Sequence, residues 1–428
     1  MHTFWFVFYN TFLLPVFWLL LRILSLFNPK IKDGFRGRKE IFRILSASRS
    51  LLFNGRKNII IHSSSLGEYQ QAIPLIEKFT SKGYNIVCTF FSPSGYNHSN
   101  ITNPYAIKVY LPFDFLHTVK KFYDTISPSQ VILMRYDLWF NFLNEARNRN
   151  IKVSVANARF NKKDAIWKLI FAGSFKKSMY NMLSTIFVID KDDESNYKST
   201  LKNFKGEIIR VGDSKYERVF ESLKDFKKDN PLPEKITAGK KIFVIGSSWK
   251  DDEDVLLPAV DKILEFEPSL LTVLVPHDPK LTKIEAIEKV FEQKYSNIRS
   301  IRYSEIDKYN GENLIIVDRI GILAGLYKIA YISYVGGGFR TGLHNILEPV
   351  IFNVPVYFSN QNKNSDEDER VIEAGCGKII TDKKQFYREL RLVLKDESYR
   401  NKLSENCRKV FENSLGTADK IVNKLLNE

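Results

Sequence analysis

The chain has 428 residues, 44% of them hydrophobic and 26% charged, which is typical of a globular protein but too long for one ordinary core. A net charge of +15 favours anionic partners such as phosphorylated substrates or lipid headgroups. Nucleic acid is not predicted as a partner, because the sequence has no zinc-finger, RNP or basic-zipper pattern. Three scattered cysteines, Cys88, Cys376 and Cys407, indicate neither a disulfide framework nor a metal site.

The first segment, residues 4–27, is apolar and aromatic, and Arg22 is its only charged side chain. About 20 residues of helix cross a bilayer core, so we predict a membrane anchor over residues 1–28. The pattern does not distinguish a helix that spans the bilayer from one that lies in its surface. A buried core helix is the alternative. The basic flank that follows favours the cytoplasmic side and anionic lipid; it holds Lys30, Lys32, Arg36, Arg38, Lys39 and Arg43.

Apolar runs alternate with helical periods from residue 58 to about residue 212, which is the βαβ rhythm of a parallel, doubly wound sheet. Helices are expected at 138–149 and 164–183, among others. The predicted strands are 59–61, 86–91, 106–111, 131–134, 152–156, 186–189 and 208–211.

The same rhythm restarts after a charged, proline-containing linker region at 220–240. We therefore expect an α/β protein with two Rossmann-like domains, 29–218 and 219–400, and a cleft between them as the default binding site. A final helix over 401–428 is expected to pack back across the domains. The predicted strands of the second domain are 241–245, 271–275, 314–317, 330–335 and 354–358.

Glu68 lies where a predicted strand, residues 59–61, turns into a predicted helix, in the stretch NIIIHSSSLGEYQQAIPLIEKF. Ser65 and Glu68 have the spacing of a capping box, in which Glu68 bonds back to the Ser65 amide. A carboxylate at this place can also act as a general base, because the helix dipole keeps it ionised. The sequence leaves both interpretations open. Pro74 is expected to kink the helix or to move its start.

A second candidate site is the stretch YVGGGFRTGLHNILEP at 334–349. Its glycines let a ligand approach the backbone closely, and a glycine loop that leads into a helix suits a phosphate. Glu348 is placed to accept hydrogen bonds from sugar hydroxyls. The alternative is a tight turn followed by a helix cap. Acidic clusters at 190–194, 251–254 and 366–369 are interpreted as solvated loops and helix starts, so no metal is predicted.

Six ordered motifs give the chain a resemblance to the 3-deoxy-D-manno-octulosonic acid (Kdo) transferase family over nearly its whole length. The family moves Kdo from CMP-Kdo to lipid A precursors. Its motifs H-x-x-S-x-G-E, E-T-E-L-W-P-N-L-L, A-N-A-R, G-x-x-K-F, P-R-H-P-E and V-G-G-S…G-G-H-N-x-L-E-P are matched, in that order, by IHSSSLGE (61–68), RYDLWFNFL (135–143), VANARF (155–160), VGDSKY (211–216), VPHDPK (275–280) and YVGGGFRTGLHNILEP (334–349).

The resemblance implies the GT-B glycosyltransferase fold, two Rossmann-like domains that face each other across a cleft. It implies an inverting transfer at the cytoplasmic side of the inner membrane, with CMP-Kdo, a lipid A precursor and the lipid surface as partners and with no cofactor. Glu68 becomes the catalytic base and Lys215 the cation that stabilises the transition state. The acceptor-side candidates are Ser65, Gly67, Arg135, Asp137 and Arg159. The donor-side candidates are Pro276, His277, Ile320, Gly321, Ile322, Gly337, Gly338, His344, Asn345, Ile346, Leu347 and Glu348.

The chain departs from the family pattern at several of these positions. Arg135 and Asp137 replace the two glutamates of E-T-E-L-W, so a carboxylate role at 135 does not transfer. His277 replaces an arginine, which makes a cation near the donor dependent on pH. Ile322 replaces the glutamate of M-G-E-L. Two rivals stay open: another GT-B enzyme, such as a UDP-sugar epimerase or a lipid-A-disaccharide synthase, and a non-catalytic, basic membrane-surface binding protein.

Overall fold

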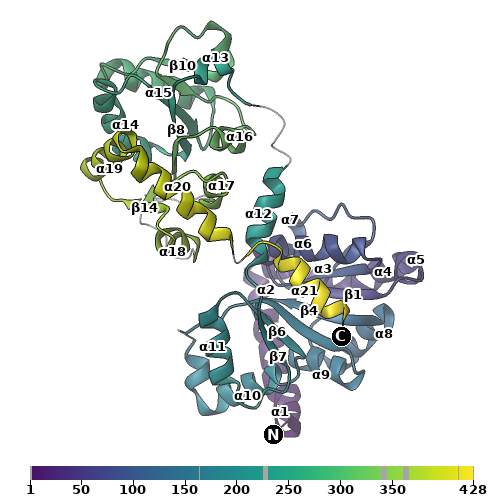
Figure 1. Ribbon diagram of the computed structural model, residues 1–428. Helices are drawn as coiled ribbons and strands as arrows, with labels where there is room; N and C mark the ends of the chain where they lie inside the picture. The colour runs from purple at the N-terminus through teal and green to yellow at the C-terminus, as the bar shows by residue number, and fades with distance from the viewer. Residues whose placement is uncertain are drawn as a thin grey trace. The chain divides into compact units, whose positions relative to one another are not determined.

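The computed structural model describes residues 2–427 apart from 163, 225–229, 338, 340–344, 360–365 and 413. The chain divides into two compact units. The first comprises Met1–Arg218 together with Ser414–Glu428, and the second comprises Val219–Asn413. Each unit has helices on both faces of a parallel sheet (Figure 1).

The first sheet has seven parallel strands in the order β3-β2-β1-β4-β5-β6-β7, and the seven predicted strands of this half are all present. The order reverses at β1, which lies between β2 and β4. Ligands of such sheets bind at the carboxyl ends of the strands beside this reversal. The strands are β1 Asn58–Ser63, β2 Asn85–Phe90, β3 Ala106–Tyr110, β4 Pro128–Met134, β5 Lys152–Ala158, β6 Thr185–Val188 and β7 Glu207–Arg210.

The second sheet also has seven parallel strands, in the order β10-β11-β9-β8-β12-β13-β14, and it reverses between β8 and β12. Two of these strands, β10 and β14, were not predicted because they are three and four residues long and lack a continuous apolar run. The strands are β8 Lys241–Ser248, β9 Leu270–Pro276, β10 Ser300–Arg302, β11 Leu314–Ile316, β12 Ile332–Val335, β13 Val356–Ser359 and β14 Gly377–Ile380.

Helices cover both faces of each sheet. In the first unit they are α1 His2–Phe8, η1 Tyr9–Leu13, α2 Leu14–Phe27, α3 Pro29–Lys39, α4 Ile41–Ala47, α5 Arg49–Leu52, α6 Leu66–Ser81, α7 Pro93–His98, α8 Leu116–Ile126, α9 Phe140–Asn148, η2 Ala165–Lys168, α10 Ile170–Tyr180, α11 Lys191–Thr200 and α21 Thr417–Leu426. The helix α12, Ser214–Lys224, begins in this unit. In the second unit they are α13 Glu234–Thr237, α14 Lys250–Leu264, α15 Leu281–Lys294, η4 Tyr303–Lys308, α16 Leu323–Lys328, α17 Leu347–Ile351, α18 Asp366–Glu373, α19 Lys383–Lys395 and α20 Glu397–Glu412.

The continuous apolar run of β1 is explained by helices on both sides of the sheet. Ile59 and Ile61 enter the core beneath α6 and α21, whereas Ile60 enters the opposite core with residues of α8 and α9. Successive side chains of a strand point to opposite faces, so a strand covered on both faces is apolar throughout. This burial fixes the end of β1, and with it the start of the helix that carries Glu68.

The C-terminal segment forms two helices instead of the single helix expected over 401–428. The first, α20, belongs to the second unit, and the second, α21, belongs to the first unit. Glu217 accepts a hydrogen bond from the Ala418 amide at 2.7 Å, and Lys78 pairs with both Glu217 and Asp419 at 3.5 and 2.8 Å. These bonds hold α21 against α6.

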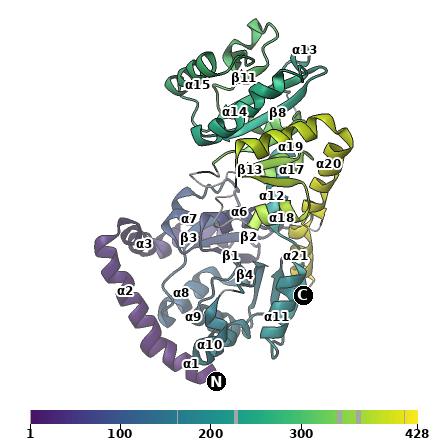
Figure 2. The ribbon, with the colours of Figure 1, turned by 90° about the vertical axis from the view of Figure 1, so that its left-hand side faces the viewer.

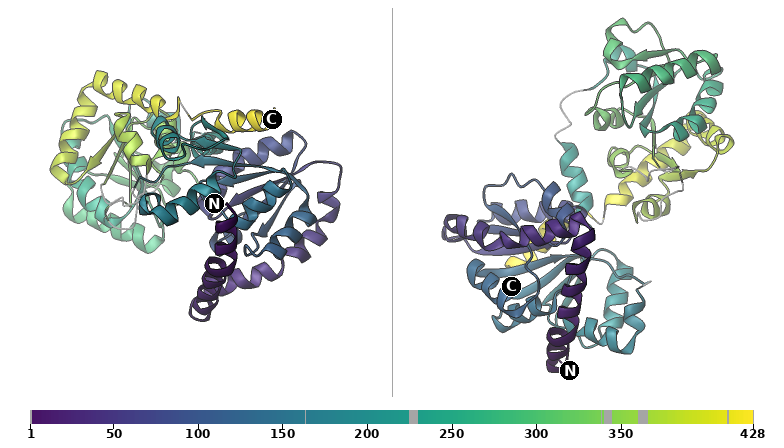
Figure 3. Two further views of the ribbon diagram at one scale, coloured as in Figure 1. Left: turned by 90° about the horizontal axis from the view of Figure 1, so that it is seen from below. Right: turned by 180° about the vertical axis from the view of Figure 1, so that it is seen from behind.

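The N-terminal residues His2–Phe27 form one helical run that is long and apolar enough to cross a membrane, with a mean hydropathy of 1.8. Only 17% of its most apolar stretch is buried. The alternative of a buried core helix is therefore wrong. One side of the run nevertheless docks on the first unit: Trp5, Tyr9 and Leu14 are buried, and the Tyr9 hydroxyl donates to Asp114 at 2.9 Å. Figures 2 and 3 show the run along the outside of this unit.

Candidate functional site

Glu68 lies in the first turn of α6, directly after β1 at the reversal of the first sheet. Its side chain is only 7% exposed, and Oε2 accepts a hydrogen bond from the Ser64 amide at 2.5 Å. The Ser65 hydroxyl accepts from the Glu68 amide at 3.4 Å. The predicted capping box is thus half correct, because Ser65 caps the helix but Glu68 bonds to Ser64. The helix begins at Leu66 and continues through Pro74, so Pro74 does not move its start.

The surroundings of the Glu68 carboxyl raise its pKa. Burial raises its pKa, and the negative charge of Asp137 raises the pKa further, whereas the hydrogen bond from Ser64 and the neighbouring His62 oppose the rise. A carboxylate with a raised pKa is a better proton acceptor near neutral pH than a solvated one. The buried position and the raised pKa of Glu68 are those expected of a general base.

His62, at the end of β1, orients the second carboxylate of this edge. Its ring is fully buried; Nδ1 hydrogen-bonds the Thr89 hydroxyl at 2.9 Å, and Nε2 hydrogen-bonds Asp137 Oδ2 at 2.9 Å. Asp137 keeps 23% of its side chain exposed. Sequence reasoning did not assign a role to His62, although it is the first residue of the H-x-x-S-x-G-E pattern.

A buried polar network fixes the start of α12, where Lys215 lies. Asn157, held in the left-handed region at φ 55°, donates to Asp213 at 3.1 Å and to the Ser214 hydroxyl at 2.8 Å. Ser214 in turn donates to the carbonyl of Gln71 in α6 at 2.6 Å, and the Lys215 amide donates to Asp213 at 2.9 Å. The segment that carries Lys215 is thereby tied both to the end of β5 and to α6.

The other acceptor-side candidates lie in or after the same strands and helix. Arg135 has a φ of 65°, and its Nε donates to Gln71 Oε1 at 3.2 Å, so it is tied to α6. Gly67 has open space where a Cβ would lie. Arg159 follows β5, and its carbonyl accepts from the Tyr197 hydroxyl at 3.1 Å.

In the second unit, Asp252 ties together the two strands at the reversal. It lies in the first turn of α14, is 1% exposed, and accepts from the Gly337 amide at 3.0 Å, the Trp249 amide at 2.9 Å and the Tyr334 hydroxyl at 2.8 Å. The glycine turn after β12 is therefore held against the end of β8. The interpretation of 251–254 as solvated is wrong for Asp252 and Glu253, which are buried; Glu253 accepts from the Ser248 hydroxyl at 2.8 Å.

The donor candidates Pro276 and His277 line a cavity of about 370 Å³ at the ends of β8 and β9. The His277 amide donates to the Ser248 carbonyl at 2.9 Å. Its ring stacks on Trp249, with 4.6 Å between ring centroids and 23° between ring planes. Aromatic walls with a few polar groups are typical of small-molecule sites. The other lining residues include Lys250, Asp254, Leu257, Lys283, Ile287, Phe291 and Tyr295.

The remaining donor candidates at the start of α17 differ in their hydrogen bonds and in their burial. Asn345 lies just before α17, accepts a hydrogen bond from the Leu347 amide at 3.1 Å, and donates one to Glu348 Oε1 at 3.3 Å. Burial raises the pKa of Glu348, and the bond from Asn345 opposes the rise. Ile346 and Leu347 are fully buried, so their side chains belong to the core.

Ile320, Gly321 and Ile322 form the turn before α16; Ile320 is exposed, and Gly321 has a φ of 92°. Gly338 and His344 lie outside the described residues. Within the described ranges, no group of three or more His, Cys, Asp or Glu side chains is placed to hold a metal ion.

Gly336→Ala is expected to destabilise the second unit. A Cβ at this position would lie 2.5 Å from the Ser247 carbonyl oxygen and 2.8 Å from Asp252 Oδ2, so the backbone must shift. Overpacking of this kind costs roughly 1–3 kcal/mol. Thermal unfolding measures the loss. Gly67→Ala, which meets no atom within 4 Å, is the control; equal melting temperatures for the two variants would contradict this account of the turn.

The chain is similar in sequence to a family model and to several curated proteins. A family model described as 3-deoxy-D-manno-octulosonic-acid transferase (kdotransferase) matches residues 37–218. A 3-deoxy-D-manno-octulosonic acid transferase from Haemophilus influenzae is 25% identical over 441 residues, which cover 98% of each chain. A bifunctional glycosyltransferase/methyltransferase from Fusobacterium nucleatum subsp. nucleatum is 26% identical over 414 residues, which cover 94% of this chain but only 61% of that relative's length.

The structure resembles UDP-GlcNAc 2-epimerase from Neisseria meningitidis, solved with UDP-GlcNAc bound, with a TM-score of 0.56 and 12% identity over 87% of this chain and 100% of the other. At this identity the likeness shows the fold alone, which is that of the GT-B class. The family model and the curated relatives go further. On their evidence the chain is similar to the 3-deoxy-D-manno-octulosonic acid transferases, by the family model over residues 37–218 and by curated relatives of 25–26% identity over most of its length.

Proposed function

We propose that this protein is an inverting glycosyltransferase that moves Kdo from CMP-Kdo to a hydroxyl of a lipid A precursor in lipopolysaccharide core biosynthesis. The observation that carries the proposal is Glu68, a buried carboxylate with a raised pKa at the carboxyl edge of the first sheet. The names of the curated relatives support the reaction class.

In the proposed step, Glu68 takes the proton of the acceptor hydroxyl, and the hydroxyl oxygen attacks the anomeric carbon of Kdo. The bond from that carbon to the phosphate breaks, and CMP leaves. Lys215 stabilises the charge that develops on the leaving phosphate. The hydrogen bonds of Asp213 and Ser214 support this role because they fix the backbone at Lys215.

We assign CMP-Kdo binding to the second unit. The glycine turn that Asp252 holds in place, the side chain of Asn345 and the carboxylate of Glu348 offer polar groups for a nucleotide and a sugar acid. The His277 ring, stacked on Trp249, adds an aromatic wall, and Pro276 lines the same cavity. This assignment needs no metal and no cofactor, because amides and cations neutralise the phosphate.

We place the protein at the cytoplasmic face of the inner membrane, held by the helical run His2–Phe27. Docking of Trp5, Tyr9 and Leu14 on the first unit leaves the other side of the run apolar and exposed. A helix with one side on protein and one side apolar suits the surface of a bilayer. We therefore favour a helix that lies in the membrane surface over one that spans it. The exposed side includes Phe4, Val7, Phe12, Val16, Leu19, Leu20, Ile23, Leu24, Leu26 and Phe27.

Asp137→Asn is expected to move the acidic limb of the pH profile of kcat/KM to lower pH. The charge of Asp137 raises the pKa of Glu68, so its removal lowers that pKa, and the base stays deprotonated at lower pH. Asparagine can still accept the bond from His62. Asp124→Asn, a change of equal charge on α8, should leave the limb in place. A limb that does not move, or that moves to higher pH, would contradict the proposed base.

A donor panel separates the proposed function from its rivals. Purified protein should be stabilised against heat by CMP more than by UDP, and it should release CMP from CMP-Kdo only when a lipid A precursor is present. Selective stabilisation by UDP would favour an epimerase or a disaccharide synthase instead. Binding to vesicles with no release of CMP would leave a membrane-surface binding protein.

A further inference from the structure

An exposed apolar ridge lies beside the N-terminal helix at the start of α10. It consists of Leu169, Ile170 and Phe171, and the Ile170 side chain is 94% exposed. The Phe171 ring packs edge-on against Trp5 and Phe8, with 4.5 and 5.3 Å between centroids. The ridge and the exposed side of the N-terminal helix therefore form one continuous apolar surface. Contiguous apolar surface of this kind marks an interaction site.

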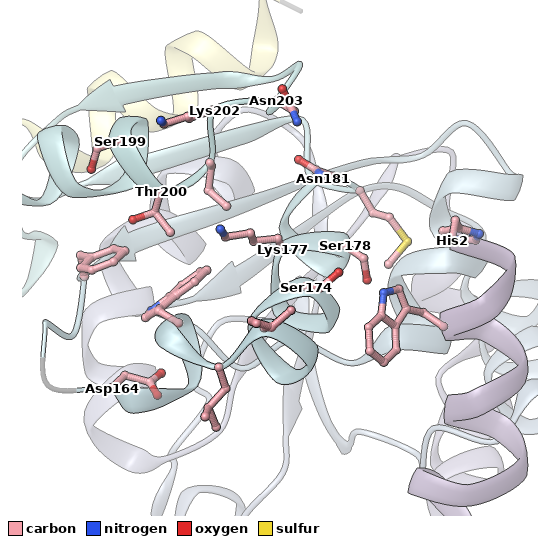
Figure 4. A pocket seen from close by; sticks show the side chains of 18 of the residues that line it. His2, Asp164, Ser174, Lys177, Ser178, Asn181, Ser199, Thr200, Lys202 and Asn203 are labelled. Carbon is pink, nitrogen blue, oxygen red and sulfur yellow. The ribbon is translucent and has the colours of Figure 1, made fainter.

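A cavity of about 950 Å³ opens between α10 and α11, next to this ridge (Figure 4). Its lining is basic: Arg147, Lys162, Lys177 and Lys202 contribute cations. Asp164 is the acidic residue among the lining side chains, and it is already paired with Lys176 at 2.5 Å. The cavity also has polar side chains that can donate hydrogen bonds to phosphate oxygens, namely Asn181, Thr200 and Asn203, whereas the hydroxyls of Ser178 and Ser199 already donate to the carbonyls of Phe175 and Asn196.

The charge of the cavity is not neutralised from within. Lys162 pairs with Asp192 at 3.0 Å, but Lys177 and Lys202 form no ion pair with any residue in the described ranges. Figure 4 shows Lys177 in the middle of the lining side chains and Lys202 at its margin. Uncompensated cations in a polar cavity favour a phosphate as occupant.

The cavity is separate from the candidate catalytic edge. Asn181 and Met182 precede β6, and the residues 199–203 precede β7, so this part of the lining lies toward the amino ends of the strands. Phe160, Lys162 and Asp164 follow the carboxyl end of β5, but none of the catalytic candidates lines the cavity. Glu68 follows β1 at the carboxyl end. The cavity therefore needs an occupant of its own, and the adjoining apolar ridge indicates which one.

We propose that this cavity binds the phosphate headgroup of an anionic phospholipid of the bilayer, while Leu169, Ile170 and Phe171 enter the membrane. The ridge is a second membrane contact in addition to the N-terminal helix, and the two contacts together fix the orientation of the first unit on the bilayer. Apolar insertion and attraction of cations to anionic lipid act together in such surfaces.

The test places a fluorophore on the ridge. The cysteines Cys88, Cys376 and Cys407 are buried, so Ile170→Cys can be labelled selectively with an environment-sensitive dye. Vesicles that contain phosphatidylglycerol should shift the emission to the blue, and lipid-borne quenchers should quench it. The same dye on Leu281→Cys, a 60% exposed position of α15, should respond to neither. An unchanged dye at 170 on vesicle-bound protein would overturn the proposal.

The double variant Lys177→Gln with Lys202→Gln, in the labelled background, tests the cavity. It should need roughly 10- to 30-fold more anionic vesicles for the same shift, since each lysine near an anionic surface contributes a factor of about five. Vesicles of pure phosphatidylcholine should show no difference between variants. Lys289→Gln with Lys294→Gln, an equal charge change at exposed positions of α15, is the control.

Two results would contradict the role of the cavity. An equal loss in the control pair would mean that net charge, and not this cavity, attracts the lipid. Heat stabilisation by inorganic phosphate that requires Lys177 and Lys202, together with no response of the dye to vesicles, would assign the cavity to a soluble phosphorylated ligand. None of these measurements depends on sugar transfer, so they stand apart from the proposed catalytic function.

Discussion

Replacing Glu68 by glutamine is expected to lower kcat for sugar transfer by roughly 10²- to 10⁴-fold, the usual contribution of a general base. The fold should survive, because the carbonyl oxygen of glutamine can accept the bond from the Ser64 amide, and the Ser65 cap bonds to backbone. The variant therefore separates the two roles that the sequence left open. Single-turnover kinetics with CMP-Kdo and a lipid A precursor measures the loss.

The matched control is Glu77→Gln, which changes the same charge at an exposed position of the same helix. Its turnover and melting temperature should equal those of the unchanged protein. If Glu68→Gln also retained near-normal turnover, Glu68 would be a structural residue that satisfies the Ser64 amide, and the proposed base would have to be abandoned.

The second large effect is expected from Asp252→Ala. Three donors, the Gly337 and Trp249 amides and the Tyr334 hydroxyl, would lose their acceptor inside the protein. Each buried donor left unsatisfied costs roughly 1–3 kcal/mol. The glycine turn would also lose its tie to β8, so we expect weaker binding of CMP as well as a lower melting temperature.

Asp251→Ala, in the same turn of α14 but only partly buried, is the control for this variant. Isothermal titration with CMP and thermal unfolding provide the two readouts. A variant that lost stability but bound CMP with unchanged affinity would show that Asp252 supports the core only. It would also show that the glycine turn does not contribute to the donor site.

The sequence predicted the parallel sheets well, because strands buried on both faces are continuous apolar runs. The fully buried strands β1, β2 and β6 of the first sheet follow this rule most closely. The pattern of apolar runs did not predict β10 and β14, which are short strands at the edges of the second sheet with partly exposed residues. The single helix expected at the C-terminus was wrong for another reason. Helical periodicity does not report the break at which the chain passes from the second unit to the first.

The position of Glu68 at the start of a helix was predicted from local pattern, but its partner was not. Whether its carboxylate bonds to Ser64 or to Ser65 depends on the path of the turn, which periodicity does not encode. The pair of His62 with Asp137 and the bonds of Asp252 with Tyr334 and Gly337 join residues 75 to 85 positions apart. Such pairings arise from the strand order. The acidic run at 251–254 was predicted to be a solvated helix start because the local pattern does not report the distant partners of Asp252, Tyr334 and Gly337.

The most direct test of the central claim is mass spectrometry of the lipid product after purified protein is incubated with CMP-Kdo and a lipid A precursor. The account predicts that the precursor gains Kdo, with CMP released in equal amount, and that no divalent metal is needed. An unmodified precursor, under conditions where the protein is folded and bound to vesicles, would contradict it.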